Sequence, residues 1–233
     1  MIESYINDGQ LFRSCIRFFD MDSIEVSLEE GLLSEEEKET LQKKKTEKSL
    51  IRSKKSLICT KLTIKDFCLL DTHELQDITM VKGVFGQPLL SSNRSFISNL
   101  GVSLSYTNNT IGILLFDLRH PMGLDIELKT VEDAPFLRDF FTEDELKLIQ
   151  MNKDILTKEM FFSAKESLSK ILKTGLTSPL CIYEISNFKV TDTSIFLYFK
   201  NFTQYHTEVT NNEYEFRSIT FPINSKKLKE CIK

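Results

Sequence analysis

The stretch FFSAKESLSK, Phe161–Lys170, predicts an amphipathic helix that carries charges in its middle. At 3.6 residues per turn, Lys165 lies on the same side as Phe161, which is the side expected to face the core. Glu166 and Lys170 share another side, in the i, i+4 order that stabilises a helix. Taken alone, these charges are typical of a surface ion pair worth about 0.3–0.5 kcal/mol. Other parts of the chain must decide whether they have a function.

A second stretch, GLDIEL at Gly123–Leu128, predicts a β-strand whose side chains alternate between two faces. Asp125 and Glu127 then lie on one face, one pleat apart. Two carboxylates placed in this way repel each other unless a cation lies between them, and hard oxygen ligands of this kind suit Mg²⁺. The alternative is a half-buried strand with a solvated acidic face, as is common in antiparallel sheets. The residues expected to face the core are Leu124, Ile126 and Leu128.

Together the two stretches form a composite signature, in which Asp125 and Glu166 are 41 positions apart. It resembles the signature of the 4′-phosphopantetheinyl transferases of the Sfp-like type. In that family a Gly-[Ile/Val/Leu]-Asp-x-Glu strand is followed, after a gap in the low forties, by [Phe/Trp]-[Ser/Cys/Thr]-x-Lys-Glu-[Ala/Ser]-x-x-Lys. The matching positions of this chain are Gly123, Asp125, Glu127, Phe162, Ser163, Lys165, Glu166, Ser167 and Lys170.

Weaker similarities extend to the first half of the chain. The loop FGQPLL, Phe85–Leu90, resembles the family's Gly-Lys-Pro loop with Gln87 in place of lysine. The turn SLSYTNN resembles its Ser-His-Ser/Thr turn with Tyr106 in place of histidine, while Arg52 and Lys61 occupy basic positions of a helix. The two replacements remove cations, so the expected consequence is weaker binding of coenzyme A or a looser preference for its 3′-phosphate.

The resemblance implies the reaction. Such an enzyme transfers 4′-phosphopantetheine from coenzyme A to a serine of an apo carrier protein and releases 3′,5′-ADP. Cleavage of a diphosphate by an alcohol needs a metal clamp, a base and a neutralising cation. The carrier is expected to be an acyl, polyketide or peptidyl carrier protein. The segment Val131–Phe141 is expected either to form the rim that the carrier touches or to pack in the core.

The resemblance also implies residue roles. Asp125, Glu127 and Glu166 are expected to ligate Mg²⁺. Either Glu166, or Glu127 through a water molecule, is expected to accept the proton of the carrier serine. Lys170 would stabilise or protonate the leaving phosphate of 3′,5′-ADP, and Lys165 would hold a phosphate of coenzyme A. The remaining residues expected to bind coenzyme A, the first two at its 3′-phosphate, are Arg52, Lys61, Tyr106 and Gln87.

The order of predicted elements indicates an α+β fold with two similar α/β halves. The resemblance implies pseudo-twofold symmetry between them, with residues 1–120 holding the basic helix that binds coenzyme A and residues 121–233 holding the metal and catalytic motifs. The local signals are an Asn108-Asn109 turn and two capping boxes, Ser34 with Glu37 and Thr142 with Glu145. Strands are expected within residues 3–24, 101–118, 123–128 and 183–221, helices within 32–64, 142–151 and 157–174, and a loop at 83–95.

The composition is that of a soluble globular chain, since 41% of its 233 residues are hydrophobic and 27% are charged. Five cysteines without a C-x-x-C pair favour a reducing compartment. The beginning lacks the apolar segment of a signal peptide, and nowhere do 18 apolar residues run together. We therefore expect a cytoplasmic protein, and the resemblance at this length implies a monomer of the type that often serves secondary metabolism.

Three other interpretations stay open. The first is a non-catalytic family member that binds coenzyme A or a carrier protein, which the residues at positions 87 and 106 favour. The second is a metal-dependent phosphohydrolase that uses the same carboxylates on a different diphosphate. The third, nucleic-acid binding, rests only on Lys38–Lys65, which carries a charge of +8 in a chain of net charge −4. We expect neither nucleic acid nor a membrane as a partner.

Overall fold

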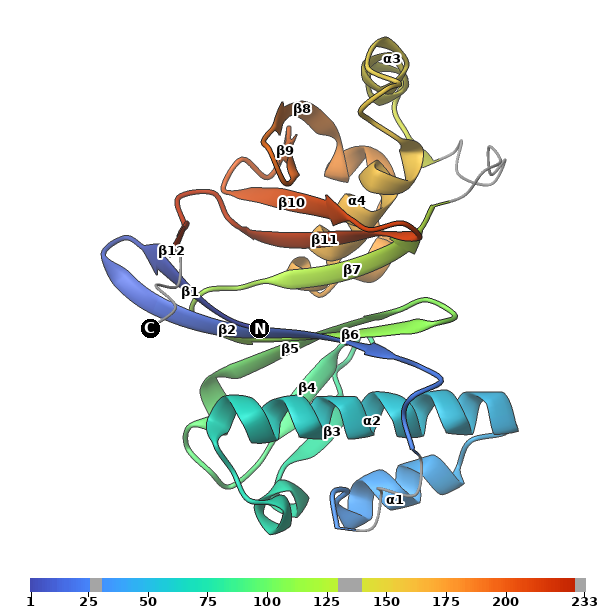
Figure 1. Ribbon diagram of the computed structural model, residues 1–233, viewed down its shortest axis with the longest axis vertical. Coiled ribbons are helices and arrows are strands. Elements are labelled where there is room, and N and C mark those ends of the chain that lie inside the picture. Colours follow the sequence, from blue (N-terminus) through green and yellow to red (C-terminus); the bar gives the residue numbers. More distant parts are fainter. Residues whose placement is uncertain (26–30, 130–139, 229–233) are drawn as a thin grey trace. The chain divides into compact units, whose positions relative to one another are not determined.

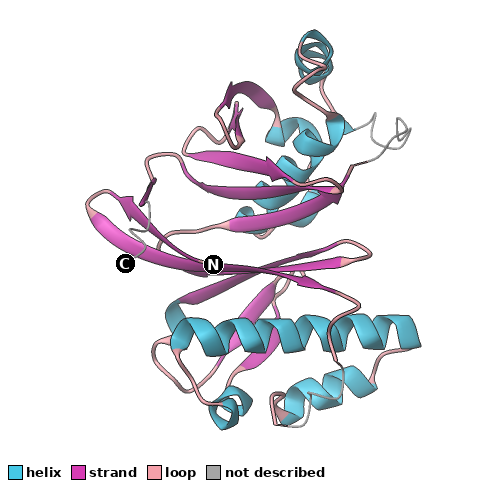
Figure 2. Ribbon diagram, viewed as in Figure 1, coloured by secondary structure: helices cyan, strands magenta, loops and turns pink. Residues whose placement is uncertain are grey.

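The chain folds into two units in the computed structural model, which describes residues 1–25, 31–129 and 140–228. Each unit combines an antiparallel sheet with helices (Figures 1 and 2). The predicted mixture of helices and antiparallel strands is confirmed. The first unit consists of Met1–Ile6, Gln10–Arg119 and Lys227–Lys233, and the second of Asn7–Gly9 and His120–Lys226.

The sheet of the first unit has five strands in the order β12-β1-β2-β6-β5. β1 and β2 form the predicted hairpin, and both residues of its turn, Asp8 and Gly9, have positive φ angles, as a tight hairpin turn requires. β6 pairs antiparallel with β2 and β5, and the predicted turn at Asn108 and Asn109 joins β5 to β6. The strands are β1 Ile2–Asn7, β2 Gln10–Asp20, β5 Leu100–Tyr106, β6 Thr110–Asp117 and β12 Lys226–Leu228.

A smaller sheet in the first unit pairs β3 (Thr79–Lys82) with β4 (Pro88–Ser91). The prediction of a loop throughout residues 83–95 was therefore wrong for β4. Pro88 is tolerated there because it is the first residue of the strand, where a missing N–H does not interrupt the ladder.

The single helix predicted over residues 32–64 is two helices, α1 (Glu35–Gln42) and α2 (Glu47–Cys68). Ser34 begins α1 in the predicted capping box. The interruption has a local cause, because Thr46 accepts a hydrogen bond from a backbone N–H in the first turn of α2 and so caps a new helix.

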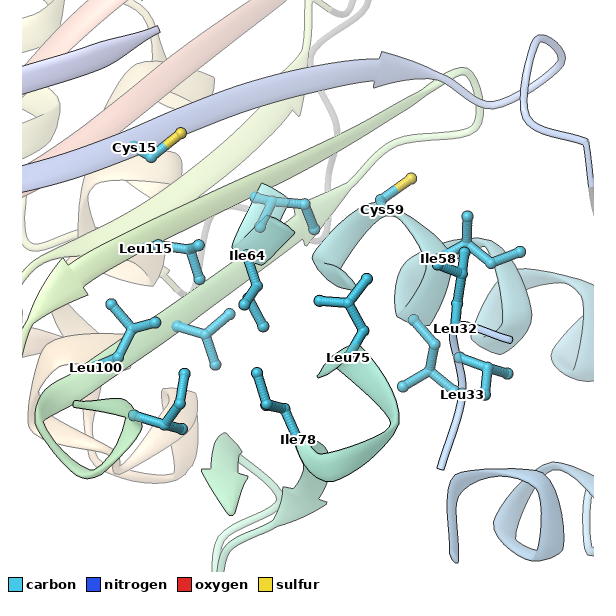
Figure 3. Packing of buried hydrophobic residues seen from close by; sticks show 14 of the residues in the cluster. Cys15, Leu32, Leu33, Ile58, Cys59, Ile64, Leu75, Ile78, Leu100 and Leu115 are labelled. Carbon is cyan, nitrogen blue, oxygen red and sulfur yellow. The ribbon is translucent and has the colours of Figure 1, made fainter. Parts of the chain in front are cut away.

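The core of the first unit lies where α2 packs against β2 and β6. Leucine and isoleucine side chains fill this space, together with the buried Cys15 and Cys59 (Figure 3). Burial raises the pKa of Cys59 to about 12, so its side chain behaves as a small apolar group. The cysteines in the described part of the chain are free thiols, namely Cys15, Cys59, Cys68 and Cys181.

The sheet of the second unit is antiparallel, with the order β7-β11-β10-β9-β8. The strands predicted in the tail are confirmed, and β7 joins them at one edge of the sheet. α4 (Lys158–Leu172) packs against β7, β10 and β11, while α3 (Glu143–Met151) contacts β8. The strands are β7 Gly123–Leu128, β8 Ile185–Val190, β9 Ile195–Phe199, β10 Tyr205–Asn211 and β11 Glu215–Pro222.

Gly123 allows α4 to approach β7 unusually closely. A Cβ atom at this position would lie 2.0 Å from the backbone oxygen of Ser167 on α4, far inside van der Waals contact. Since side chains alternate along a strand, Asp125 and Glu127 share the face of Gly123. The acidic face of β7 is therefore the face that α4 covers.

No helix in the described part of the chain is long and apolar enough to cross a membrane.

A buried histidine on β10 makes the second unit sensitive to acid. His206 is surrounded by the rings of Phe196, Tyr198 and Phe221, at centroid distances of 5.1, 5.9 and 4.5 Å. Its Nε2 has no hydrogen-bond partner among the described residues. Burial lowers the pKa of His206 from 6.5 to about 4, so the folded protein holds the neutral ring at a pH where the unfolded chain is already protonated.

We expect His206→Phe to flatten the pH dependence of stability. Because the folded pKa is depressed, the contribution of neutral His206 is complete above pH 6.5 and is lost as the pH falls toward about 4. Between pH 7 and pH 4.5 the variant should lose about 2–3 kcal/mol less unfolding free energy than the parent, as measured by urea unfolding. His73→Gln, at an exposed site, serves as the control, and equal losses in parent and His206→Phe would contradict the assignment.

Candidate active site

The carboxylates of β7 form one side of the candidate site. Asp125 is 5% exposed, and Glu127 is half-buried. Asp125 stands opposite Ser218 of β11 in the ladder, and Glu127 stands opposite Phe216. Ser218 is fully buried, and its Oγ has no hydrogen-bond partner within the described part of the chain. The sequence pattern did not single out this serine, since a lone serine in a strand carries no distinguishing signal.

Helix α4 supplies the other side. Its Lys170 ammonium donates to Asp125 Oδ1 at 2.8 Å and to the backbone oxygen of Leu124 at 2.7 Å. The i, i+4 spacing predicted a surface ion pair between Lys170 and Glu166. In the structure, the Lys170 ammonium contacts β7. The structure thus brings Asp125 and Lys170, which are far apart in the sequence, into direct contact.

The pKa values show that the carboxylates lie close enough to affect one another. Burial raises the pKa of Glu127 to about 7, and the charges of Asp125, Glu166 and Glu159 add to the effect. Burial also raises the pKa of Glu166, assisted by Asp125 and opposed by Lys170. The three carboxylates repel one another in a half-buried place. A bound cation would reduce this repulsion.

These residues suit a divalent cation in their chemistry. Asp125, Glu127 and Glu166 offer the hard carboxylate oxygens that Mg²⁺ prefers. Within residues 1–25, 31–129 and 140–228, however, no three His, Cys, Asp or Glu side chains are gathered closely enough to hold a metal ion. The three carboxylates are chemically suitable Mg²⁺ ligands. In this structure Asp125 forms an ion pair with the Lys170 ammonium.

Lys165 lies away from these carboxylates. Its side chain is fully buried, and its ammonium contacts Glu145 Oε2 at 2.7 Å and the backbone oxygen of Phe140 at 2.8 Å. The predicted contact of Lys165 with a phosphate of coenzyme A would require this ion pair to open. Glu145 was identified in the sequence only as a capping residue, and nothing in the local pattern revealed its second partner.

A pocket of about 740 Å³ lies in the first unit, between the helices α1 and α2 and the β3–β4 hairpin. Arg52 and Tyr106 both line it, with the guanidinium of Arg52 4.5 Å from the centre of the Tyr106 ring. Three lysines also line the pocket, namely Lys44, Lys48 and Lys82, and two glutamates, Glu36 and Glu37, so that basic residues outnumber acidic ones there. Two residues predicted from the weaker similarities are thus neighbours in one basic pocket.

The other two residues predicted to bind coenzyme A are engaged within the fold. Lys61 is 1% exposed and contacts Glu37 Oε2 at 2.9 Å, and it also donates to the backbone oxygen of Leu75. The Gln87 side chain folds back over its own turn, where Oε1 accepts a hydrogen bond from the Phe85 N–H at 3.0 Å. Contact of Lys61 with a ligand would likewise require a buried ion pair to open.

The segment expected to touch a carrier protein, Val131–Phe141, lies outside the described residues except for its last two, Phe140 and Phe141. The ring of Phe140 packs edge-on against Phe162 of α4, with 5.3 Å between the centroids.

The segment that holds the carboxylates matches a known family. Residues 121–220 match the family model described as the 4′-phosphopantetheinyl transferase superfamily. The matched segment contains β7 and α4, and with them Asp125, Glu127, Glu166 and Lys170. No curated protein matches the chain. The match indicates a transferase domain whose general chemistry is transfer of phosphopantetheine.

Proposed function

We propose that this protein transfers 4′-phosphopantetheine from coenzyme A to a serine of an apo carrier protein in a Mg²⁺-dependent reaction, as enzymes of the Sfp-like type do. The contact that carries the proposal is the one between Lys170 of α4 and Asp125 of β7. It joins the two sequence motifs within the segment that matches the transferase superfamily. The charge of Asp125, which adds to the burial that raises the pKa values of Glu127 and Glu166, supports it further.

Asp125, Glu127 and Glu166 are the residues that would hold Mg²⁺. When bound, the ion would neutralise charge on the diphosphate of coenzyme A. Glu166, or Glu127 through a water molecule, takes the proton of the carrier serine. Lys170, already held beside these carboxylates, provides positive charge for the leaving phosphate of 3′,5′-ADP.

We assign the basic pocket of the first unit to the nucleotide part of coenzyme A. Arg52 provides a guanidinium for the 3′-phosphate, and Tyr106 provides an aromatic surface with one hydroxyl. Lys61 and Gln87 do not enter this assignment, because both side chains have partners within the fold. Residues 1–120 would thus bind the cofactor, and residues 121–233 would hold the metal and catalytic groups.

A repeated arrangement of charges supports the proposal that the two halves are similar and related by pseudo-twofold symmetry. In the first unit the capping-box residue Glu37 pairs with buried Lys61, and its Oε1 accepts from the N–H of Met80. In the second unit the capping-box residue Glu145 pairs with buried Lys165 in the same way, and its Oε1 accepts from the N–H of Ile185.

We further propose a monomeric cytoplasmic enzyme that serves secondary metabolism.

The first experiment is incubation of the protein with coenzyme A, Mg²⁺ and apo forms of acyl, polyketide and peptidyl carrier proteins, followed by intact-mass spectrometry. We expect at least one carrier to gain the mass of one phosphopantetheine, and the gain to disappear when EDTA removes the metal. Absence of any gain across the three carrier classes would contradict the proposal. If coenzyme A still bound, the remaining interpretation would be a non-catalytic protein that binds coenzyme A or a carrier.

A further inference from the structure

A completely enclosed ion pair of the second unit joins α4 to the beginning of α3. The side chains of Lys165 and Glu145 are both 0% exposed, and their charged atoms are 2.7 Å apart. The same ammonium donates to the backbone oxygen of Phe140 at 2.8 Å. Lys165 therefore connects α4 to the residues immediately before α3.

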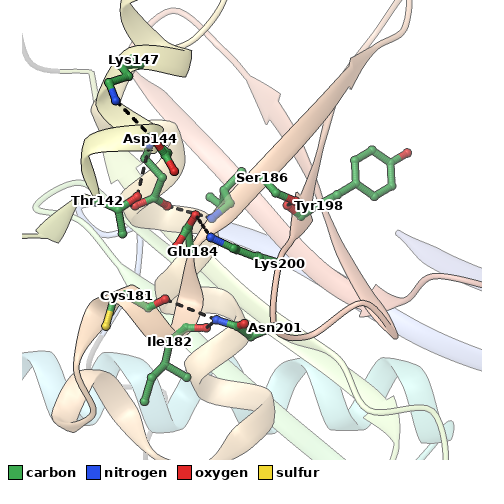
Figure 4. Close-up of polar contacts among 12 residues, drawn as sticks. Thr142, Asp144, Lys147, Cys181, Ile182, Glu184, Ser186, Tyr198, Lys200 and Asn201 are labelled. Atoms are coloured by element: carbon green, nitrogen blue, oxygen red, sulfur yellow. Dashed lines mark hydrogen bonds and ion pairs between the residues drawn. The ribbon is translucent and has the colours of Figure 1, made fainter.

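Glu145 uses both carboxylate oxygens in this connection. Oε2 accepts from the N–H of Thr142 at 2.9 Å as well as from Lys165, and Oε1 accepts from the N–H of Ile185 at 2.8 Å. One carboxylate thus ties together the N-cap of α3, the first residue of β8 and the middle of α4 (Figure 4 shows the surroundings of Thr142).

Glu166 directly follows Lys165 on α4, so the position of the helix about its axis determines where the Glu166 carboxylate lies. The helix is held at two places. Lys165 holds it to α3 and β8, and Lys170 holds it to Asp125 and Leu124 on β7. Glu166 stands between these two attachments, just over one helical turn from Lys170 and one residue from Lys165.

We propose that Glu145 and Lys165 are positioning residues, which orient Glu166 toward Asp125 and Glu127, and that Lys165 does not itself bind a phosphate of coenzyme A. The proposal rests on the proposed function and deepens it. A phosphate that reached Lys165 would displace Glu145 and leave that carboxylate buried without its cation, which is strongly unfavourable. Loss of an outer partner of this kind typically lowers metal affinity or activity by about 10–100-fold.

A double-mutant cycle tests this assignment. The variants are Glu145→Gln, Lys165→Met and the two combined, at a temperature where urea unfolding shows each of them folded. We expect each single change to lower kcat about tenfold or more while the KM for coenzyme A changes by less than about threefold. The double variant should recover part of the loss, because it leaves no uncompensated charge in the interior.

Mn²⁺ binding, followed by electron paramagnetic resonance without any substrate, reports on the position of Glu166 independently of transfer. The single variants should bind Mn²⁺ about tenfold more weakly than the parent, with recovery in the double variant. The control is Asp144→Asn with Lys147→Met, an exposed ion pair of 3.5 Å on α3 of the same unit (Figure 4). It should change neither Mn²⁺ binding nor kcat.

Three results would overturn the proposal. A Lys165→Met protein with a raised KM for coenzyme A and no recovery in the double variant would show direct phosphate binding. Variants that lose stability but keep the parent's kcat and Mn²⁺ affinity would show a purely structural ion pair. If the parent protein binds no Mn²⁺, there is no metal site toward which Glu166 could be oriented. If Mn²⁺ binding follows the expected pattern while no carrier is modified, positioning stands and the proposed function fails.

Discussion

Glu166→Gln is expected to lower the rate of phosphopantetheine transfer by about 10²–10⁴-fold, the range over which a general base or its equivalent acts. The amide has nearly the shape of the carboxylate but can neither accept the serine proton nor balance a cation. Because burial and the charge of Asp125 raise the pKa of Glu166, its ionised form is under repulsion in the folded protein. Removing that charge should leave the unfolding free energy unchanged or slightly higher. Single-turnover transfer followed by intact mass, and urea unfolding, measure the two quantities.

The matched control is Glu143→Gln on α3, an exposed glutamate of the same unit. It removes one negative charge without touching β7 or α4, and it should change the transfer rate by less than about twofold, as surface substitutions usually do. A Glu166→Gln protein that transfers within threefold of the parent rate would exclude Glu166 as base and as metal ligand. Glu127, acting through a water molecule, would then be the base to test.

Gly123→Ala is expected to be the most disruptive small substitution in the second unit. Its Cβ would lie 2.0 Å from the backbone oxygen of Ser167, and a backbone atom within a helix cannot move aside as a flexible side chain can. The helix must shift, which for overpacked interiors costs about 1–3 kcal/mol or more. The same shift would separate Lys170 from Asp125, so transfer should fall together with stability. Urea unfolding and the mass assay test both effects.

Gly9→Ala separates this packing effect from the general cost of replacing glycine. Gly9 has a φ of +77° and nothing within 4 Å of an added Cβ, so the change introduces only backbone strain of about 1–2 kcal/mol. It should leave transfer by the folded protein unchanged. If Gly123→Ala proved no more destabilising than Gly9→Ala, the close approach of α4 to β7 would not be important for the fold.

Elements with local signals were predictable. The capping boxes at Ser34 and Thr142, the Asn108-Asn109 turn and the strand from Gly123 to Leu128 each depend on residues only a few positions apart. The break between α1 and α2 was missed even though Thr46 has the chemistry of a cap, because the charged residues around it favour a helix and no Gly or Pro marks an end. β4 was missed because Pro88 and the neighbouring glycines favour a loop, and its pairing with β3 overrides them.

The candidate site was predictable in its residue types but not in their partners. Asp125, Glu127, Glu166 and Lys170 were identified from the spacing of two motifs. The spacing could not show that Lys170 contacts Asp125, since the two are 45 residues apart and the contact depends on which face of β7 the helix covers. Gly123 allows that approach, and its role appears only when Ser167 is seen beside it.

Lys165 illustrates the difference between what the sequence determines and what only the tertiary structure decides. By itself the sequence determined the helical segments apart from the break between α1 and α2, most strands, the acidic pattern and the motif in which Lys165 stands. Only the tertiary structure decided that this lysine is enclosed with Glu145 while Lys170 faces the carboxylates. The physical reason is that helix periodicity and capping are local, whereas burial of a charge and the choice of its partner depend on groups that the fold brings together from distant parts of the chain.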